Sequence, residues 1–186
     1  MQLASFAAAA LIVLLTPGPT NTLLAAAGAA MGVRRAALLP VAEAAGYALA
    51  IAAFLAVTSR FSDVGFVMPA LKAAAAVWLV VAAARLWRQP VRIDAAAHVT
   101  ALRRVFVATI LNPKAMLVGT VLIPELMRDR QALGLATFIA LSGLAGTAWL
   151  TMGSLLPGTA RPYAYKAAAI VLCAFSVAAA SSTLRG

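Results

Sequence analysis

Apolar residues are gathered along this chain into six long stretches, and most charged residues lie in the short segments between them. A helix needs about 20 predominantly apolar residues to cross the roughly 30 Å hydrocarbon core of a bilayer, and each stretch has about that length. The short connections leave no room for a separate soluble domain. The pattern predicts an all-α integral membrane bundle, a single transmembrane domain over 1–186, with six transmembrane helices at residues 3–31, 36–58, 66–86, 105–124, 133–155 and 163–184.

The composition supports a membrane protein and excludes several other classes. The chain is 64% hydrophobic and 11% charged, whereas soluble domains are about 45–50% apolar and about 25% charged. The single cysteine, Cys173, excludes a disulfide framework, dithiol redox chemistry and a multi-cysteine metal site. No spacing of His, Cys and carboxylate residues is typical of a metal site, and no glycine-rich phosphate loop follows a strand. We therefore expect neither a metal nor a cofactor.

The positive charge is unevenly divided between the two sides of the predicted bundle. The formal net charge is +10, but the basic residues lie between apolar stretches rather than among aromatics on a polar face, so we expect no nucleic-acid partner. Cytoplasmic loops carry an excess of Lys and Arg, which places the richer side in the cytoplasm and both termini outward. No basic residue precedes Arg34, so we expect a retained first helix and not a cleaved signal peptide. The richer side holds Arg34, Arg35, Arg85, Arg88, Arg92, Arg103, Arg104, Arg161 and Lys166, and the poorer side holds Arg60, Arg128, Arg130 and Arg185.

Prolines interrupt the first and the fourth apolar stretch. Residues 16–19 read Thr-Pro-Gly-Pro, and Asn112-Pro113-Lys114 interrupts the fourth stretch. Each break opens a group of three stretches, so the second group enters the membrane in the opposite sense. This arrangement is typical of inverted repeats, whose substrate sites lie at broken helices near the midplane, and it predicts repeat one at about 1–88 and repeat two at about 104–186. Two chance kinks are the alternative, because proline is common in membrane helices.

The first break combines missing amide donors with small polar side chains. Pro17 and Pro19 lack amide hydrogens, so carbonyls near them lose helical partners and need others inside a bilayer. The polar neighbours either satisfy the break themselves or line a cavity in which the N-terminus of the second half-helix attracts a carboxylate. We favour the cavity, because so dense a polar cluster is costly to bury without use. The candidate substrate-binding residues here are Thr16, Pro17, Gly18, Pro19, Thr20 and Asn21.

Two charged residues lie inside predicted helices. Lys114 follows Asn112 and Pro113, about ten residues or roughly 15 Å into the fourth stretch. A charge at that depth marks a functional site, with snorkelling to the interface as the alternative. Glu43 could pair with Lys114, hold a substrate ammonium or carry a coupling proton, or it could be a structural ion pair or lie at the cytoplasmic mouth. The tryptophans, which we expect to be lipid-facing or interfacial anchors, are Trp78, Trp87 and Trp149.

Together these motifs resemble the LysE/RhtB family of amino-acid exporters. Pro-Gly-Pro at 17–19, followed by Gly-Val-Arg-Arg at 32–35, is similar to the family's first signature. Leu-Asn-Pro-Lys-Ala at 111–115, followed by Pro124, is similar to its Asn-Pro-Lys motif. The looser similarities are Gly46 and the pairs Leu71-Lys72 and Trp78-Leu79, and the departures are Thr20 before Asn21, Ala36 and Ala42 in place of glycine, and Glu125 in place of an amide.

The resemblance implies efflux of an amino acid or similar small zwitterion across a bacterial inner membrane, with protons as the coupling ion. It also implies alternating access, in which one three-helix repeat rocks against the other. On this analogy a half-helix N-terminus receives the substrate carboxylate, and Glu43 with freed carbonyls receives the ammonium. The many small residues permit close helix packing and are compatible with a homodimer.

Other functions stay open as alternatives. A non-transporting membrane assembly subunit would not need polar breaks in both halves. An ion or metabolite channel would need more charged residues for strong ion selectivity. A membrane enzyme would need a nucleophile beside a base, and no histidine lies inside a predicted helix. We therefore expect no enzymatic activity and no catalytic residue.

Overall fold

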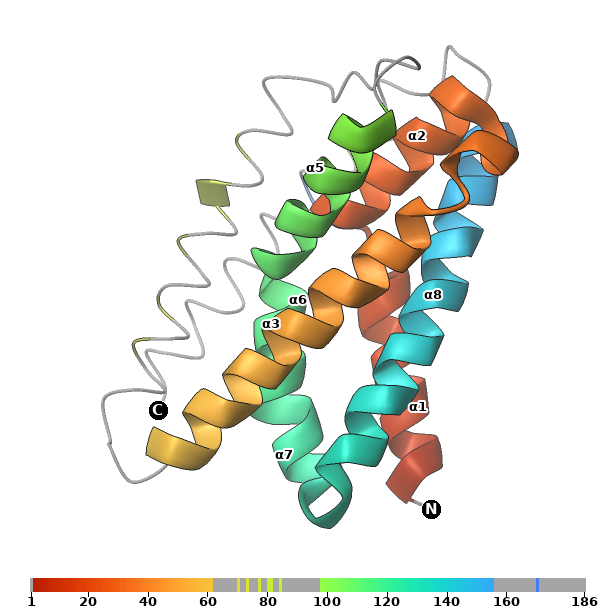
Figure 1. The fold of residues 1–186 in the computed structure, drawn as a ribbon. Coiled ribbons are helices and arrows are strands. Elements are labelled where there is room, and N and C mark those ends of the chain that lie inside the picture. Colours follow the sequence, from red (N-terminus) through yellow and green to blue (C-terminus); the bar gives the residue numbers. More distant parts are fainter. Residues whose placement is uncertain are drawn as a thin grey trace.

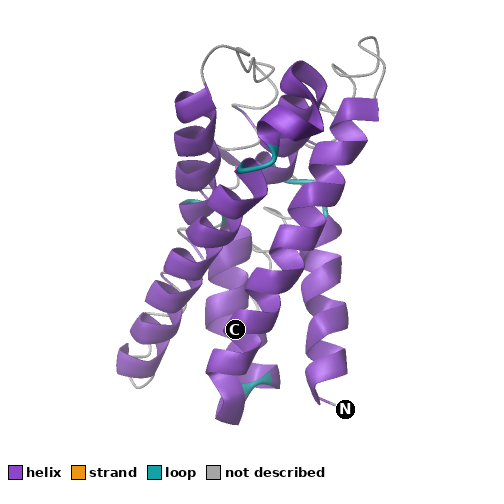
Figure 2. Cartoon of the chain, turned by 45° about the vertical axis from the view of Figure 1, so that its right-hand side comes forward, coloured by secondary structure: helices purple, strands orange, loops and turns teal. Residues whose placement is uncertain are grey.

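The computed structural model describes residues 2–61 and 98–155, together with isolated positions at 70, 73, 77, 80, 81, 84 and 170. Within these residues the chain is helical and contains no strand (Figures 1 and 2), which confirms the all-helical prediction for this part. The third and sixth predicted membrane helices, at 66–86 and 163–184, lie outside the described ranges, apart from isolated positions.

The described helices form four long segments, two of them broken. The helices α3 and α8 are each long and apolar enough to cross a membrane, and each of the two broken pairs reaches the same length if it is taken as one span. The structure therefore has two to four candidate membrane spans in its described part. The elements are α1 (Gln2–Leu15), α2 (Pro19–Ala36), α3 (Leu39–Phe61), α5 (His98–Ile110), α6 (Pro113–Leu117), the π-helix η1 (Val118–Leu122), α7 (Ile123–Leu126), the 3₁₀ turn η2 (Arg128–Arg130) and α8 (Gln131–Leu155).

Both predicted breaks are present, and proline explains them. The chain bends by 62° between α1 and α2 and by 40° between α5 and the α6–α7 segment. Pro19 and Pro113 each begin a new helix, where a residue without an amide hydrogen costs nothing. Pro124 cannot donate to the carbonyl four residues before it, and the wide π-helix η1 ends two residues before this proline. Near its C-terminal end α2 is interrupted again at Gly32, whose φ of 75° favours glycine.

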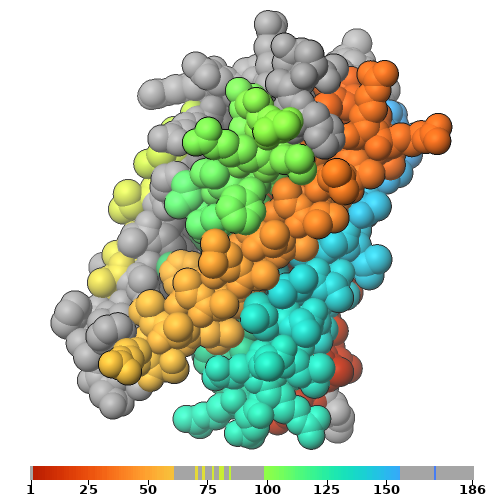
Figure 3. Space-filling view, in the orientation of Figure 1, coloured from red at the N-terminus to blue at the C-terminus, as the bar shows by residue number. Residues whose placement is uncertain are grey.

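Glycines bring the helices into close contact. A Cβ at Gly28 would lie 1.9 Å from the carbonyl oxygen of Leu150, and a Cβ at Gly153 would lie 1.9 Å from that of Ala25. The backbones of α2 and α8 therefore approach each other as only small residues permit, which is typical of helix packing in membranes. Figure 3 shows α3 lying diagonally between α5 and α8, and α3 contacts both of them.

Two apolar clusters fill the interior of the described bundle, and buried polar residues lie between them. Each long segment passes from one cluster to the other; α3, for example, runs from Leu39 through Glu43 to Tyr47. We call the buried polar set Thr20, Asn21, Glu43, Thr109, Asn112 and Lys114 the polar layer. The α1-side cluster is Phe6, Ala10, Leu14, Tyr47, Ala50, Ile51, Ala115, Val118, Ile123, Met127, Phe138 and Ala145, and the α2-side cluster is Leu23, Leu24, Ala27, Met31, Ala36, Leu39, Ala101, Val105 and Leu150.

The outer surface of the described helices is unusually apolar. Ile12, Val41 and Leu144 are 70%, 62% and 68% exposed. Large exposed apolar side chains on several helices indicate a surface that faces lipid or another protein. This surface supports the prediction of a membrane protein on grounds independent of helix length.

The described arginines lie at the two ends of the bundle. The last turn of α2 holds Arg34 and Arg35, and it lies at the same end as the beginning of α5 (Figure 1). The last turn of α3, with Arg60, lies at the opposite end together with η2. The other basic residues used to predict the orientation, 85, 88, 92, 161, 166 and 185, lie outside the described residues.

Candidate functional site

The break between α1 and α2 is held by side chains that donate to backbone carbonyls. The Nδ2 of Asn21 donates to the carbonyl oxygens of Leu14, at 2.9 Å, and Thr16, at 2.8 Å. Because an amide group has two N–H donors, Asn21 uses both of them here. The hydroxyl of Thr22 donates to the carbonyl of Gly18 at 2.8 Å. These residues therefore satisfy part of the break themselves, as one of the two sequence interpretations expected.

The break between α5 and α6 is organised by one buried asparagine. Asn112 caps α6, and its Oδ1 accepts a hydrogen bond from the backbone N–H of Lys114 at 3.0 Å. Its Nδ2 donates to the hydroxyl oxygens of Thr20, at 3.0 Å, and Tyr47, at 3.2 Å. The carbonyl oxygen and both N–H groups of the asparagine side chain are therefore used. Asn112 therefore joins α6 to α2 and α3.

The two breaks meet, although about a hundred residues of chain separate them. The ammonium of Lys114 donates to the carbonyl of Thr16 and lies 3.5 Å from that of Leu14. The hydroxyl oxygens of Thr20 and Thr109 lie 3.4 Å apart. Lys114 is only 9% exposed, so it does not snorkel to an interface. Every predicted site residue of the two proline motifs thus lies in or beside one polar layer.

Glu43 lies in the same layer without a hydrogen-bond partner for one of its oxygens. Its side chain is 2% exposed, and Oε2 accepts no hydrogen bond. Lys114 interacts with it electrostatically, but the hydrogen bonds of the Lys114 ammonium go to carbonyl oxygens. The direct ion pair that the sequence suggested as one alternative is therefore not the arrangement found. A buried polar atom without a hydrogen-bond partner destabilises the folded protein. Oε2 of Glu43 is therefore the atom of this layer that most needs a ligand or a proton.

Thr109 of the polar layer was missed as a site residue in the sequence, and so were three residues that lie beside the layer. Tyr47 lies one helical turn after Glu43, and that spacing of four could have shown that both face the same side. Gly146 faces Glu43 so closely that a Cβ would lie 2.3 Å from Oε2, yet the sequence marks it only as a packing residue. Trp149, expected to be a lipid-facing or interfacial anchor, is half-buried, and its Nε1 donates to the carbonyl of Leu14 at 3.4 Å. The indole thus bonds to a carbonyl of the break, a contact that the expectation of an anchor did not include. Trp78 and Trp87 lie outside the described residues.

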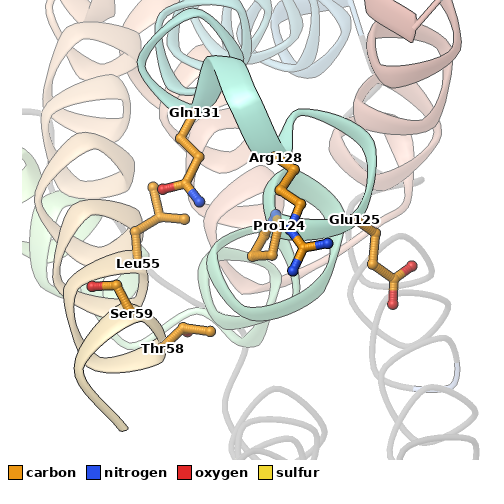
Figure 4. A pocket seen from close by; sticks show the side chains of 7 residues that line it. All are labelled: Leu55, Thr58, Ser59, Pro124, Glu125, Arg128 and Gln131. Atoms are coloured by element: carbon orange, nitrogen blue, oxygen red, sulfur yellow. The ribbon is translucent and has the colours of Figure 1, made fainter. Parts of the chain in front are cut away.

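A separate open cavity of about 510 Å³ lies where α3 ends and α8 begins. In Figure 4 the amide of Gln131 points toward Leu55 of α3, Arg128 lies over Pro124, and Glu125 points away from α3. Thr58 and Ser59 complete the lining on the α3 side. None of the predicted site residues lines this cavity. It therefore marks an opening at one end of the bundle and not the polar layer itself.

Comparisons of the chain with protein-family models, with curated proteins and with solved structures find no match. The function must therefore be inferred from the polar layer and its surroundings.

Proposed function

We propose that the chain is a membrane transporter that exports amino acids or related small zwitterions, with six transmembrane helices arranged as two inverted three-helix repeats. The support is the contact between two proline-broken segments, one from each half, in a buried polar layer between apolar clusters. Transporters built of inverted repeats place their substrates at such breaks. On this proposal the arginine-rich end of α2 and α5 faces the cytoplasm of a bacterium, the membrane is its inner membrane and both termini lie outward.

The observation that carries the proposal is the free oxygen of Glu43. An ammonium group is the natural partner for a buried carboxylate oxygen, and a charged hydrogen bond contributes about 1.5–3 kcal/mol. The carbonyls of Leu14 and Thr16 already accept hydrogen bonds from Asn21 and Lys114. The substrate ammonium is therefore assigned to Glu43 alone, in place of the shared role that the sequence suggested for Glu43 and the freed carbonyls.

The other end of a zwitterion needs an electropositive partner. The helix α2 begins within this layer, and no side chain caps its N-terminus. Helix N-termini attract carboxylates because their first amide groups lack intrahelical partners. The ammonium of Lys114 adds positive charge to the same region. A ligand with a carboxylate and an ammonium at opposite ends thus complements both features.

Protons are the coupling ion that this layer suggests. In the absence of substrate, a proton on Glu43 removes the cost of a buried charge, and a substrate ammonium removes the same cost when it binds. Exchange of one for the other couples substrate movement to proton movement. Access to Glu43 requires α8 to move away from α3 at Gly146. The cavity lined by Arg128 and Gln131 lies at the end of the bundle that we assign to the outside.

Efflux from proteoliposomes tests the proposal. Purified wild type, Glu43→Gln and Asp129→Asn are compared in vesicles loaded with single labelled amino acids, chosen by screening overexpressing cells for resistance to toxic analogues. Asp129 lies in the exposed turn η2 and serves as the matched loss of one carboxylate. We expect Glu43→Gln to lower efflux at subsaturating substrate about tenfold or more, because a neutral hydrogen bond is weaker than a charged one.

The proton dependence is measured in the same vesicles. We expect collapse of the pH gradient to stop wild-type efflux and Asp129→Asn to behave as the wild type. Equal efflux by Glu43→Gln and wild type over the whole substrate range would remove Glu43 from the site, and failure of every tested amino acid would remove the proposed substrate class.

A further inference from the structure

The end of α1 presents carbonyl oxygens to the interior of the bundle. The last carbonyls of a helix have no intrahelical donor and carry the negative end of its dipole. Here the carbonyls of Leu14 and Thr16 face the polar layer. They accept hydrogen bonds from three other segments, through Asn21 of α2, Lys114 of α6 and Trp149 of α8. In a low-dielectric interior such a group of oxygens is an attractive place for a cation.

The cation at these carbonyl oxygens is a side chain of the protein itself, the ammonium of Lys114. The Lys114 ammonium reaches across from the second half of the protein to both carbonyls. Gly18 leaves room for it, because a Cβ at that position would lie 3.2 Å from Cε and 3.4 Å from Nζ of Lys114. The backbone of Lys114 is held in turn by the Asn112 cap. The ammonium is thus aimed at the carbonyls by features from both breaks.

We propose that the break of α1 is a binding site for a monovalent cation and that the Lys114 ammonium is its permanent occupant. The side chain takes the position that a free ion would otherwise fill, and it joins the two breaks without a metal. Removal of the ammonium leaves a vacant site with the same oxygens. That site should accept a small primary ammonium ion, whose N–H groups match the donors that were lost.

Chemical rescue of Lys114→Ala tests this proposal. The n-propylammonium ion has the three carbons and the ammonium that this substitution removes beyond Cβ. Thermal unfolding of the purified variant in detergent is followed by circular dichroism at increasing n-propylammonium chloride, with tetramethylammonium chloride at equal ionic strength as the control without N–H donors. We expect Lys114→Ala to have a lower Tm than the wild type and to recover most of the loss, saturably, in n-propylammonium alone. We expect the wild type to respond equally to the two salts.

Lys114→Met is the matched variant, because it removes the ammonium but fills most of the space that Lys114→Ala leaves empty. It keeps the proposal testable if Lys114→Ala does not fold. Methionine keeps most of the side-chain volume but supplies no charge or N–H group, so we expect a lowered Tm without recovery in n-propylammonium. A Tm for Lys114→Met equal to or above that of the wild type would overturn the proposal, and so would equal responses of Lys114→Ala to the two ammonium salts. The readout is stability, so a failure of amino-acid export would leave this test unaffected.

Discussion

Replacing Gly146 with alanine separates the binding role of Glu43 from its contribution to the fold. A Cβ at Gly146 would lie 2.3 Å from Oε2 of Glu43 and 3.3 Å from the nearest side-chain atoms of Leu24 and Pro40. Non-bonded heavy atoms prefer separations of about 3.5 Å, so the carboxylate must retreat by roughly 1 Å. It is the end of a flexible side chain, and the two apolar contacts need much smaller adjustments. The substitution therefore moves the proposed ammonium partner more than it disturbs the helix packing.

The size of the effect follows from the interaction that is lost. A hydrogen bond to a charged group contributes about 1.5–3 kcal/mol, and about 1.4 kcal/mol corresponds to a tenfold change in affinity. We therefore expect Gly146→Ala to raise the substrate concentration for half-maximal efflux by roughly 10- to 150-fold. The thermal stability should fall little, because alanine is the better helix former and offsets part of the crowding.

The assay compares efflux kinetics and Tm for Gly146→Ala and Gly143→Ala. Gly143 lies on the same helix, and a Cβ there meets nothing within 4 Å, so we expect wild-type half-saturation from this control. A Gly146→Ala variant with wild-type half-saturation and wild-type Tm would refute the reasoning, because it would mean that the position of the Glu43 carboxylate is unimportant. A large fall in Tm would instead show that the added methyl group disturbs the packing of α8 against its neighbours and not only the Glu43 carboxylate.

Two further predictions concern stability. Gly153→Ala places a Cβ 1.9 Å from the backbone carbonyl oxygen of Ala25, which cannot move aside without separating α2 from α8. We expect a loss of about 1–3 kcal/mol in the free energy of unfolding, visible in thermal unfolding as a Tm below that of Gly143→Ala; equal values would contradict the close approach of these helices. Asn112→Ala removes the cap of α6 and both donors to Thr20 and Tyr47. A loss of about 1–3 kcal/mol is expected, and unfolding at the wild-type midpoint would show that the two breaks are held together by other contacts.

Local chemistry allowed the helices and their breaks to be predicted from the sequence. The length of an apolar stretch decides whether a helix can cross a bilayer, and a proline removes its own amide donor in any surroundings. The first and fourth predicted helices are accordingly broken at Pro17–Pro19 and at Pro113, with bends of 62° and 40°. The boundaries differ: α3 begins at Leu39 and not at residue 36, and α5 begins at His98, seven residues before the predicted residue 105.

Which polar group meets which was decided only by the tertiary structure. From the sequence, Lys114 was equally able to take part in a functional site or to reach an interface, and the freed carbonyls were expected to line a ligand cavity. In the structure those carbonyls accept hydrogen bonds from Lys114, Asn21 and Trp149, and one oxygen of Glu43 has no hydrogen-bond partner. The physical reason is distance: hydrogen bonds act over about 3 Å, and the approach of segments a hundred residues apart is set by the packing of whole helices against one another. Residue type determines what a side chain can bond to, whereas packing determines which partner comes within reach.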